Sequence, residues 1–271
     1  MLPHAPEKGQ KLLVIDGDLV AFRAASVAHR ETVWPSESGN PDEDRVTMEL
    51  DTAAASNYFR CTVDRLKKPG EDVVVALSSH VNFRKQMFPE YKANRAGKAP
   101  PLGLGWVRSW VRARFPFAEV QGLEADDLLG LYATGPNNSG VVVCSDDKDI
   151  RSIPCVIRSI TEPVTEDIIP PAVADWNHMY QTLIGDASDG YSGCPGVGPV
   201  AARKILGEPG ERPLSDLWDS VVTAYKKKML SEDDALRQAR MARILRWGEF
   251  EKTGPAPCEF KINLWSLASG S

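Results

Sequence analysis

Three short apolar runs, each followed at once by polar residues, constrain the fold of this chain more than any other feature. The runs are KLLVI (11–15), VVVAL (73–77) and VVVC (141–144). Each has the length and β-branched content of a strand buried on both faces, as the strands of parallel sheets are. Helix-compatible segments lie between them, at 44–67, 104–114 and 124–134. This alternation predicts an α/β fold with a mostly parallel sheet flanked by helices.

The second part of the chain is predicted to be helical. After Pro170-Pro171, amphipathic stretches follow at 172–185, 199–206, 214–229 and 232–247. Residues 34–44 have the composition of a loop, and FKINLW (260–265) is expected to add an edge strand. The predicted organisation is an α/β core over residues 1–170, a helical region over 171–250 and an extension over 251–271.

Composition excludes several classes of protein. No stretch approaches the roughly 20 apolar residues of a membrane span, and residues 1–11 lack the apolar core of a signal peptide. The five cysteines are far apart and form no CxxC pair, which argues against a disulfide framework or a zinc ribbon. We therefore expect a cytoplasmic, monomeric protein without a membrane partner.

Acidic residues gather in four short groups. They are Asp16 with Asp18 in VIDGD, Glu124, Asp126 and Asp127 in LEADDLLG, Asp147 and Asp149 in SDDKD, and Asp186 and Asp189 in GDASDGYSG. In parallel sheets, ligands bind outside the carboxyl ends of the strands, where the first and third groups would lie. Carboxylate oxygens in this number suit Mg²⁺ or Mn²⁺ rather than zinc. Taken singly, each group is equally well explained by surface acids at turns or helix ends.

Charge is segregated along the chain, although its net charge is −5. Between Arg84 and Arg114 there are eight basic residues and one acid, Glu90. A basic stripe beside an acidic pocket lets an acidic protein hold DNA. A solvated basic helix is the alternative if the stripe stands alone.

In order and spacing, the four acidic groups resemble the motifs of flap endonucleases and 5′→3′ exonucleases. The basic segments Asn82-Phe83-Arg84-Lys85 and Pro89 to Arg95 resemble the base of that family's helical arch, here about residues 82–114. The likeness is greatest to the exonucleases of short-tailed bacteriophages, and it extends to Met241 to Arg246. It covers residues 11 to 250 and implies a PIN-like nuclease core.

The resemblance implies a role for each group. Asp16, Glu124 and Asp126 would hold the metal ion that activates the attacking water. Asp127, Asp147, Asp149, Asp186 and Asp189 would hold or tune a second ion at the leaving group. Lys92 would contact the scissile phosphate, and Arg95 would bind phosphate with two hydrogen bonds. Arg84 is included with these catalytic residues, and a terminal base would stack on Tyr91, unless Tyr91 is a core aromatic.

A glycine-rich segment provides the second specific signal. Gly193, Gly196 and Gly198 precede Pro199 and a short helix that carries Arg203 and Lys204. Glycine lets the backbone approach a phosphate closely, and the N-terminus of a helix attracts anions. The segment resembles the family's helix–three-turn–helix, which grips duplex DNA and whose loop carbonyls would hold K⁺. An ordinary loop between helices is the alternative.

One position departs from the family pattern. Counting back from Phe83-Arg84 places Ser79 where the family has a metal-site aspartate after a strand. Asp18, His80 or water would then have to replace that carboxylate.

The resemblance implies a Mg²⁺- or Mn²⁺-dependent nuclease with two metal ions. It would act from 5′ ends of double-stranded DNA or at 5′ flaps, and on RNA in RNA·DNA hybrids, during phage replication or recombination in a bacterial cytoplasm. The rival hypothesis is a catalytically weakened relative that binds branched or 5′-ended DNA as an accessory protein. A PIN-type ribonuclease would share the acidic sheet edge but not the glycine segment.

Overall fold

Alternate residues of the buried strands point into two different cores, which places the sheet between two layers. The computed structural model describes residues 2–95, 97–252 and 260–262. In β1 (Leu12–Asp16), Leu12 and Val14 join one hydrophobic cluster, whereas Leu13 and Ile15 join another. Successive side chains of a strand point to opposite faces, so a strand that is apolar throughout must be covered on both sides.

The central sheet has six strands in the order β5-β4-β1-β6-β7-β8. Besides β1 they are β4 (Asp72–Ala76), β5 (Phe117–Ala118), β6 (Val141–Cys144), β7 (Cys155–Arg158) and β8 (Glu166–Ile169). Neighbouring strands are parallel except β7 and β8, which are antiparallel. The predicted, mostly parallel sheet is confirmed, and the three apolar runs form its adjacent strands β4, β1 and β6.

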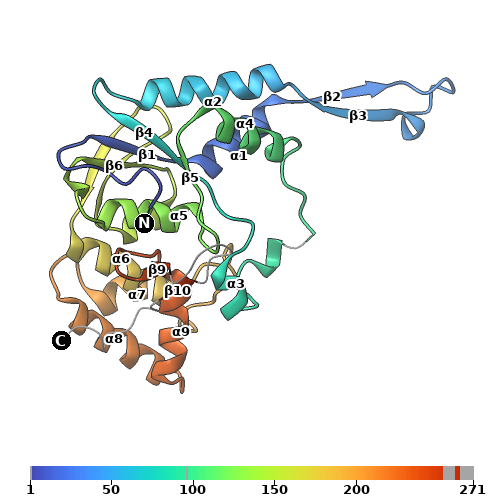
Figure 1. The fold of residues 1–271 in the computed structure, drawn as a ribbon. Helices are drawn as coiled ribbons and strands as arrows, with labels where there is room; N and C mark the ends of the chain where they lie inside the picture. The colour runs from blue at the N-terminus through green and yellow to red at the C-terminus, as the bar shows by residue number, and fades with distance from the viewer. Residues whose placement is uncertain (1, 96, 253–259, 263–271) are drawn as a thin grey trace.

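Helices cover both faces of this sheet (Figure 1). On one face, α1 (Gly17–Ala28), α2 (Thr52–Leu66) and α4 (Leu104–Arg114) share a cluster with Leu13 and Ile15. On the other face lies α5 (Ala125–Thr134). Shorter helical pieces are α3 (Phe83–Met87) and the 3₁₀ turns Pro41–Glu43, Ala93–Arg95, Asn138–Gly140 and Lys148–Ser152.

The segment 44–67, expected to be one helix, is divided, so that prediction was wrong for its first part. Arg45–Leu50 forms β3, which pairs antiparallel with β2 (His29–Trp34). Helix α2 begins only at Thr52, because Asp51 caps it by accepting the N–H of Ala54 at 2.9 Å. The β2–β3 hairpin projects from the rest of the molecule (Figure 1), and the loop expected at 34–44 forms its tip from residue 35 onward.

The second part of the chain is helical, as predicted. It contains α6 (Pro171–Ile184), α7 (Pro199–Leu206), α8 (Leu214–Lys226) and α9 (Glu232–Ala242), whose buried side chains form a separate cluster. Helix α9 begins after the cap Ser231 and ends five residues earlier than expected, where Arg243 leaves helical geometry and pairs with Glu249 at 2.6 Å. None of the helices in the described residues is long and apolar enough to cross a membrane.

A strand does form within the run 260–265, but not at the edge of the central sheet. β10 (Phe260–Ile262) pairs antiparallel with β9 (Phe250–Lys252) in a separate two-stranded sheet. Residues 263–265 of the run lie outside the described residues.

A buried ion pair links β7 and β8 to the residue that precedes β4. Arg158, at the end of β7, is 1% exposed, and its two terminal nitrogens donate to the carboxylate of Glu71 at 2.7 and 2.8 Å. Its Nε donates to Glu166 of β8 at 2.8 Å. Burial raises the pKa of Glu71, but Arg158 and the N–H of Lys68 lower it by more, so it lies below the usual 4.5.

We expect Glu71→Gln to lower the free energy of unfolding by about 3 kcal/mol, because it leaves a buried guanidinium without its main counter-charge. Because the pKa of Glu71 is lowered in the folded protein, its contribution is complete above pH 4.5 and is lost as the pH falls further. Urea denaturation at pH 7 and at pH 3 measures both effects. Asp167→Asn, which breaks the exposed pair with Arg151, is the matched control and should cost under about 1 kcal/mol. Equal losses from the two variants would contradict this assignment.

Candidate active site

The acidic groups meet in one cleft at the carboxyl ends of the parallel strands. The cleft has a volume of about 340 Å³ and is lined by acids from the ends of β1 and β6, the start of α5 and the loop after α6. These acids are Asp16, Asp18, Glu124, Asp126, Asp147, Asp149, Asp186 and Asp189. Three cations, Lys92, Arg95 and Lys148, share the same wall. Seven of the eight acids expected from the sequence are therefore together, and the exception is Asp127.

Asp16 is held at the point where β1 becomes α1. One carboxylate oxygen accepts the N–H of Leu19 at 3.0 Å, and the other accepts the hydroxyl of Ser145 at 2.8 Å. Burial raises the pKa of Asp16 to about 6; these hydrogen bonds oppose the shift, and the charges of Asp18 and Asp147 add to it. The two hydrogen bonds thus hold the Asp16 carboxylate in one orientation, but they leave most of its negative charge uncompensated.

Asp126 and Asp149 show the same effect. Burial raises the pKa of Asp126 well above its usual value, and the charges of Asp16 and Asp147 raise it further. Burial and the charge of Asp147 raise the pKa of Asp149 to about 7, although Lys148 opposes them. Carboxyl groups that repel one another in this way indicate a negative potential that a cation would relieve.

Glu124 is a cleft carboxylate that the protein's own cations neutralise. It caps α5 and accepts Lys92 Nζ at 2.7 Å, the Tyr91 hydroxyl at 2.9 Å and Arg84 Nη1 at 3.2 Å. Burial raises the pKa of Glu124, but Lys92 and Arg84 lower it by more, to about 2. Glu124 is therefore ionised at any physiological pH, and it connects α5 to the segment that carries Lys92.

Asp127 does not belong to the cleft, which corrects the metal role expected for it. It is fully buried, and both of its oxygens accept from Arg84, at 2.6 and 2.7 Å. They also accept the N–H groups of Glu124 and Leu245. With this many donors, Asp127 has a structural role in which it holds the C-terminal segment and Arg84 against α5.

The catalytic roles expected for Arg84 and Tyr91 are corrected for the same reason. Arg84 is 3% exposed and Tyr91 4% exposed, and neither lines the cleft. The Tyr91 hydroxyl donates to Glu124 and, at 3.2 Å, to Asp189. Tyr91 is thus a core aromatic that positions Glu124 and Asp189 through its hydroxyl.

The loop after α6 docks directly on the backbone around Lys92. Lys92 N donates to Asp189 O at 2.8 Å, and Lys92 itself has a positive φ of 54°. Gly190 has a φ of +81°, and a Cβ placed on it would lie 2.4 Å from Glu90 O. Only glycine allows this close approach, which holds the Lys92 segment and the Asp189 loop together.

Within that loop, the partners of Asp186 neutralise its charge more completely than those of Asp189 do. Asp186 accepts from Lys148 Nζ at 2.8 Å and from the Ser188 N–H at 2.7 Å. Burial raises the pKa of Asp186, but these partners lower it by more, to about 2. Burial also raises the pKa of Asp189, which Lys92 and Arg95 offset only in part.

The model of the family "5'-3' exonuclease, N-terminal resolvase-like domain" matches residues 11–165. The chain belongs to this 5′-3′ exonuclease family. It is 31% identical to an exodeoxyribonuclease of Enterobacteria phage T3 over 95% of this chain and 93% of that one. It is 30% identical to an exonuclease of Escherichia phage T7, covering 88% of this chain and 89% of the relative.

Solved structures show the same fold as this chain. The flap endonuclease of bacteriophage T5, in a pseudo-enzyme-product complex with DNA and metal ions, superposes with a TM-score of 0.56. The match covers 86% of this chain and 89% of the T5 protein, at 16% sequence identity. The PIN-like α/β core with a helical C-terminal region, expected from the resemblance, is confirmed.

The glycine-rich segment of the chain lies between α6 and α7, as expected, but its glycines serve different purposes. Gly193 is packed within the protein, because a Cβ on it would lie 2.3 Å from Gly185 N and 2.5 Å from Leu183 O. Gly193 is itself buried, which argues against its expected contact with DNA. Gly196 has a φ of +75°, and a Cβ placed on it would lie near Lys228 Nζ. A Cβ placed on Gly198 would have no neighbouring atom within 4 Å. These two leave the backbone open to a ligand.

Helix α7 carries two exposed basic residues, Arg203 and Lys204. The Arg203 guanidinium lies 5.7 Å from the ring centroids of Trp176 and Tyr180, which stack at 5.0 Å. Lys204 is exposed and lines a groove with α8. Both residues are exposed, and their contact with a phosphate backbone stays a prediction.

The residue that follows β4 into the cleft is Ser78, not Ser79, which corrects the counting from Phe83-Arg84. Ser78 lines the cleft, and its Oγ accepts the N–H of Ala125 at 2.9 Å. Ser79 instead donates its N–H to Leu123 O, and its hydroxyl accepts the N–H of Val81.

Sequence reasoning missed three supporting residues. Ser145 and Gln181 donate to Asp16 and Asp149, and Lys148 pairs with Asp186. Ser145 and Lys148 stand inside SDDKD, so their position beside the acids was the available signal. Gln181 lies in the middle of α6, and nothing in its local sequence marks it.

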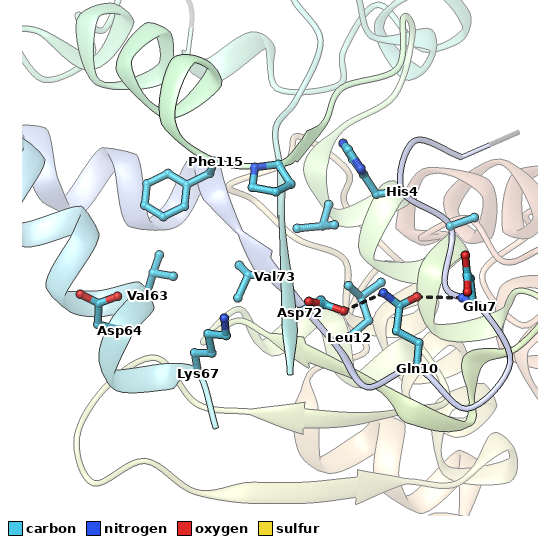
Figure 2. Close-up of a pocket in the computed structure, with 13 residues that line it drawn as sticks. His4, Glu7, Gln10, Leu12, Val63, Asp64, Lys67, Asp72, Val73 and Phe115 are labelled. Carbon is cyan, nitrogen blue, oxygen red and sulfur yellow. Dashed lines mark hydrogen bonds between the residues drawn. The ribbon is translucent and has the colours of Figure 1, made fainter. Parts of the chain in front are cut away.

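A second cavity, of about 610 Å³, lies at the opposite, amino ends of the strands (Figure 2). It is lined by residues such as His4, Gln10, Lys67 and Asp72, and Gln10 donates to Asp72 across it at 2.8 Å. Acids, bases and apolar side chains are mixed here without a gathering of one charge. The amino ends of parallel strands are also not where such sheets bind ligands, so the acidic cleft is the candidate active site.

We expect Gly190→Ala to destabilise the fold by about 2 kcal/mol and to reduce nuclease activity, because the new methyl group pushes the Lys92 segment away from Asp189. Gly9→Ala is the matched control. Gly9 has the same φ of +81° and no neighbour within 4 Å, so it carries the backbone cost of about 1 kcal/mol without the clash. Urea denaturation and a nuclease assay on both variants separate the two effects, and equal losses would show that contact with Glu90 is unimportant.

Proposed function

We propose that this exonuclease is a divalent-metal-dependent 5′→3′ exodeoxyribonuclease that also cuts 5′ flaps. The observation that carries the proposal is the cleft itself, where seven acids expected from the sequence stand beside Lys92 and Arg95. Four of these acids, Asp16, Asp126, Asp149 and Asp189, have raised pKa values, which a divalent cation would bring down. A protein that only binds DNA gains nothing from such repulsion.

The donor set fits Mg²⁺ or Mn²⁺, since all the donors are hard carboxylate oxygens. In the part of the chain that the structure describes, no three Asp, Glu, His or Cys side chains converge closely enough to form a finished metal shell. Asp16, Glu124 and Asp126 would hold one ion, and Asp147, Asp149, Asp186 and Asp189 would hold or tune the other. Two such ions stabilise the attacking and the leaving oxygen in displacement at phosphorus.

Lys92 contributes charge rather than a proton. Burial lowers its pKa, but Glu124 and Asp189 raise it by more, so its ammonium group stays protonated at neutral pH. Lys92 Nζ lies 2.7 Å from Glu124 and 3.7 Å from Asp189, so it is held at the cleft wall before substrate arrives. A preorganised cation offsets the charge that develops on phosphate in the transition state. Arg95, which is half exposed, can reach a neighbouring phosphate.

Duplex DNA would be held by the segment that precedes α7. Gly196 and Gly198 give a phosphate access to the backbone, and Arg203 and Lys204 add positive charge. Contacts of this kind position DNA without reading its sequence. We infer that the substrates are 5′-ended or 5′-flapped duplexes, including RNA·DNA hybrids, and that the products carry a 5′-phosphate. We also infer that the backbone carbonyls of the glycine-rich loop before α7 bind K⁺. Phage DNA replication or recombination in a bacterial cytoplasm is the corresponding setting.

We expect Asp126→Ala and Asp149→Ala each to reduce cleavage by about 100-fold or more while DNA binding survives, because they remove metal donors but no phosphate contact. The assay is a 5′-labelled flap and a recessed-end duplex, each with Mg²⁺, Mn²⁺ or chelator. Asp167→Ala, at an exposed acid of β8, is the control and should cut normally. Full cleavage in excess chelator would overturn the metal proposal. DNA binding without cleavage by the wild type under every condition would favour the accessory-protein hypothesis.

We expect Lys92→Ala to lower kcat by about 100-fold or more and to weaken DNA binding by less than about tenfold, because a charge aimed at the reacting phosphate acts mainly in the transition state. Single-turnover kinetics and a binding titration measure the two quantities. Lys67→Ala, at the cavity on the opposite side of the sheet, is the matched control (Figure 2). Parallel losses in kcat and affinity would make Lys92 an ordinary phosphate anchor.

A further inference from the structure

Asp18 is brought to the cleft by an unusually close contact between α1 and β4. Gly17, the first residue of α1, has no room for a side chain, since a Cβ would lie 2.3 Å from Val75 Cγ1 and 2.6 Å from Ala76 O. This contact presses the first turn of α1 against the end of β4. Asp18 follows immediately and lines the cleft with Asp16 and Asp126.

The end of β4 supplies no acid of its own. Ser78 lines the cleft there, and its N–H donates to Asp18 Oδ2 at 2.9 Å. Its hydroxyl accepts the N–H of Ala125, the first residue of α5. The carboxylate of Asp18 therefore lies where β4 meets α5, beside a part of the cleft wall to which the end of β4 contributes a serine.

The other oxygen of Asp18 lacks a hydrogen bond. Among the described residues, Asp18 Oδ1 is buried without a hydrogen-bond partner, and so is Arg108 Nε, which lies 3.4 Å from it. Arg108 instead donates a hydrogen bond to Ser78 O. Oδ1 itself is buried, whereas the Asp18 side chain as a whole is 30% exposed and lines the cleft. A charged oxygen without a hydrogen bond is costly, and a metal ion is one partner that satisfies it.

We propose that Asp18 is a metal-holding carboxylate that replaces the acid missing from the end of β4. This inference rests on the proposed metal-dependent function. Arg108 competes for the same carboxylate, because its positive charge favours the ion pair and opposes the approach of a cation. Asp18 thus belongs to the ligand set, and Arg108 sets how tightly that set binds.

The test is direct metal binding without DNA, by calorimetry with Mg²⁺ and by electron paramagnetic resonance with Mn²⁺. We expect Asp18→Asn to raise the Kd for Mn²⁺ by about tenfold or more, since it removes a charged ligand but keeps an oxygen for the N–H of Ser78. We expect Arg108→Gln to lower the Kd by about threefold, since it removes a competing charge. If Asp18 only paired with Arg108, the two variants would lose stability alike and leave the Kd unchanged.

A rescue completes the experiment. Ser78→Asp, placed on the Asp18→Asn background, restores a carboxylate at the end of β4 and can still accept the N–H of Ala125, so the Kd should return toward the wild-type value. Asp72→Asn, at the amino end of the same strand, is the control and should bind as the wild type does. Unchanged binding by Asp18→Asn overturns this inference alone. No binding of Mn²⁺ by the wild type overturns the proposed function and this inference together.

Discussion

Mutual repulsion among carboxylates is the constraint around which this protein is organised. The parallel sheet brings the ends of β1 and β6 together, and α5 and the loop after α6 add further acids to the same cleft. The protein offsets part of that charge with Lys92, Arg95 and Lys148, each supplied by a segment distant in sequence from the acid that it meets. These contacts fasten the helical region and the 82–114 segment to the sheet. The pKa of Asp16 remains at about 6 and that of Asp149 at about 7, so the offset is incomplete.

The arrangement separates two kinds of acid that the sequence does not distinguish. Glu124 and Asp127 stand one turn apart on α5, yet Glu124 faces the cleft and Asp127 is closed off by Arg84. Arg84 touches both, so one guanidinium neutralises the interior acid fully and the cleft acid in part. The charges of Arg84 and Asp127 can be buried together because Arg84 binds Asp127 with two hydrogen bonds. The Asp127 oxygens also accept further hydrogen bonds, including one from the N–H of Leu245. The interior pair therefore supports the floor of the active site.

The central strands, most helices and the meeting of seven acids followed from the sequence, because unbroken apolar runs and acids at strand ends are local signals. The sequence reasoning failed where tertiary contacts decide. The sequence predicts a helix over 44–67, but Arg45–Leu50 forms a strand of a hairpin that is mostly exposed, so no buried face marks it in the sequence. Helix α1 was not predicted at all, because its apolar residues follow directly on a strand without a break. Counting back from Phe83-Arg84 indicates Ser79 rather than the cleft residue Ser78, because residue counting cannot show how the chain turns after Ala76. The burial of Tyr91 depends on packing against Met241 and Tyr191.

The β2–β3 hairpin has a consequence for how the protein behaves at high concentration. It is a two-stranded ribbon with Val33, Trp34, Val46 and Met48 about half exposed, and within the described residues neither outer edge pairs with another strand. Such edges template association between molecules. Residues 29–50 carry six acids and only two basic residues, arginines 30 and 45. The acidic residues of hairpins on neighbouring molecules repel one another, so they oppose self-association. This repulsion weakens in high salt and at low pH.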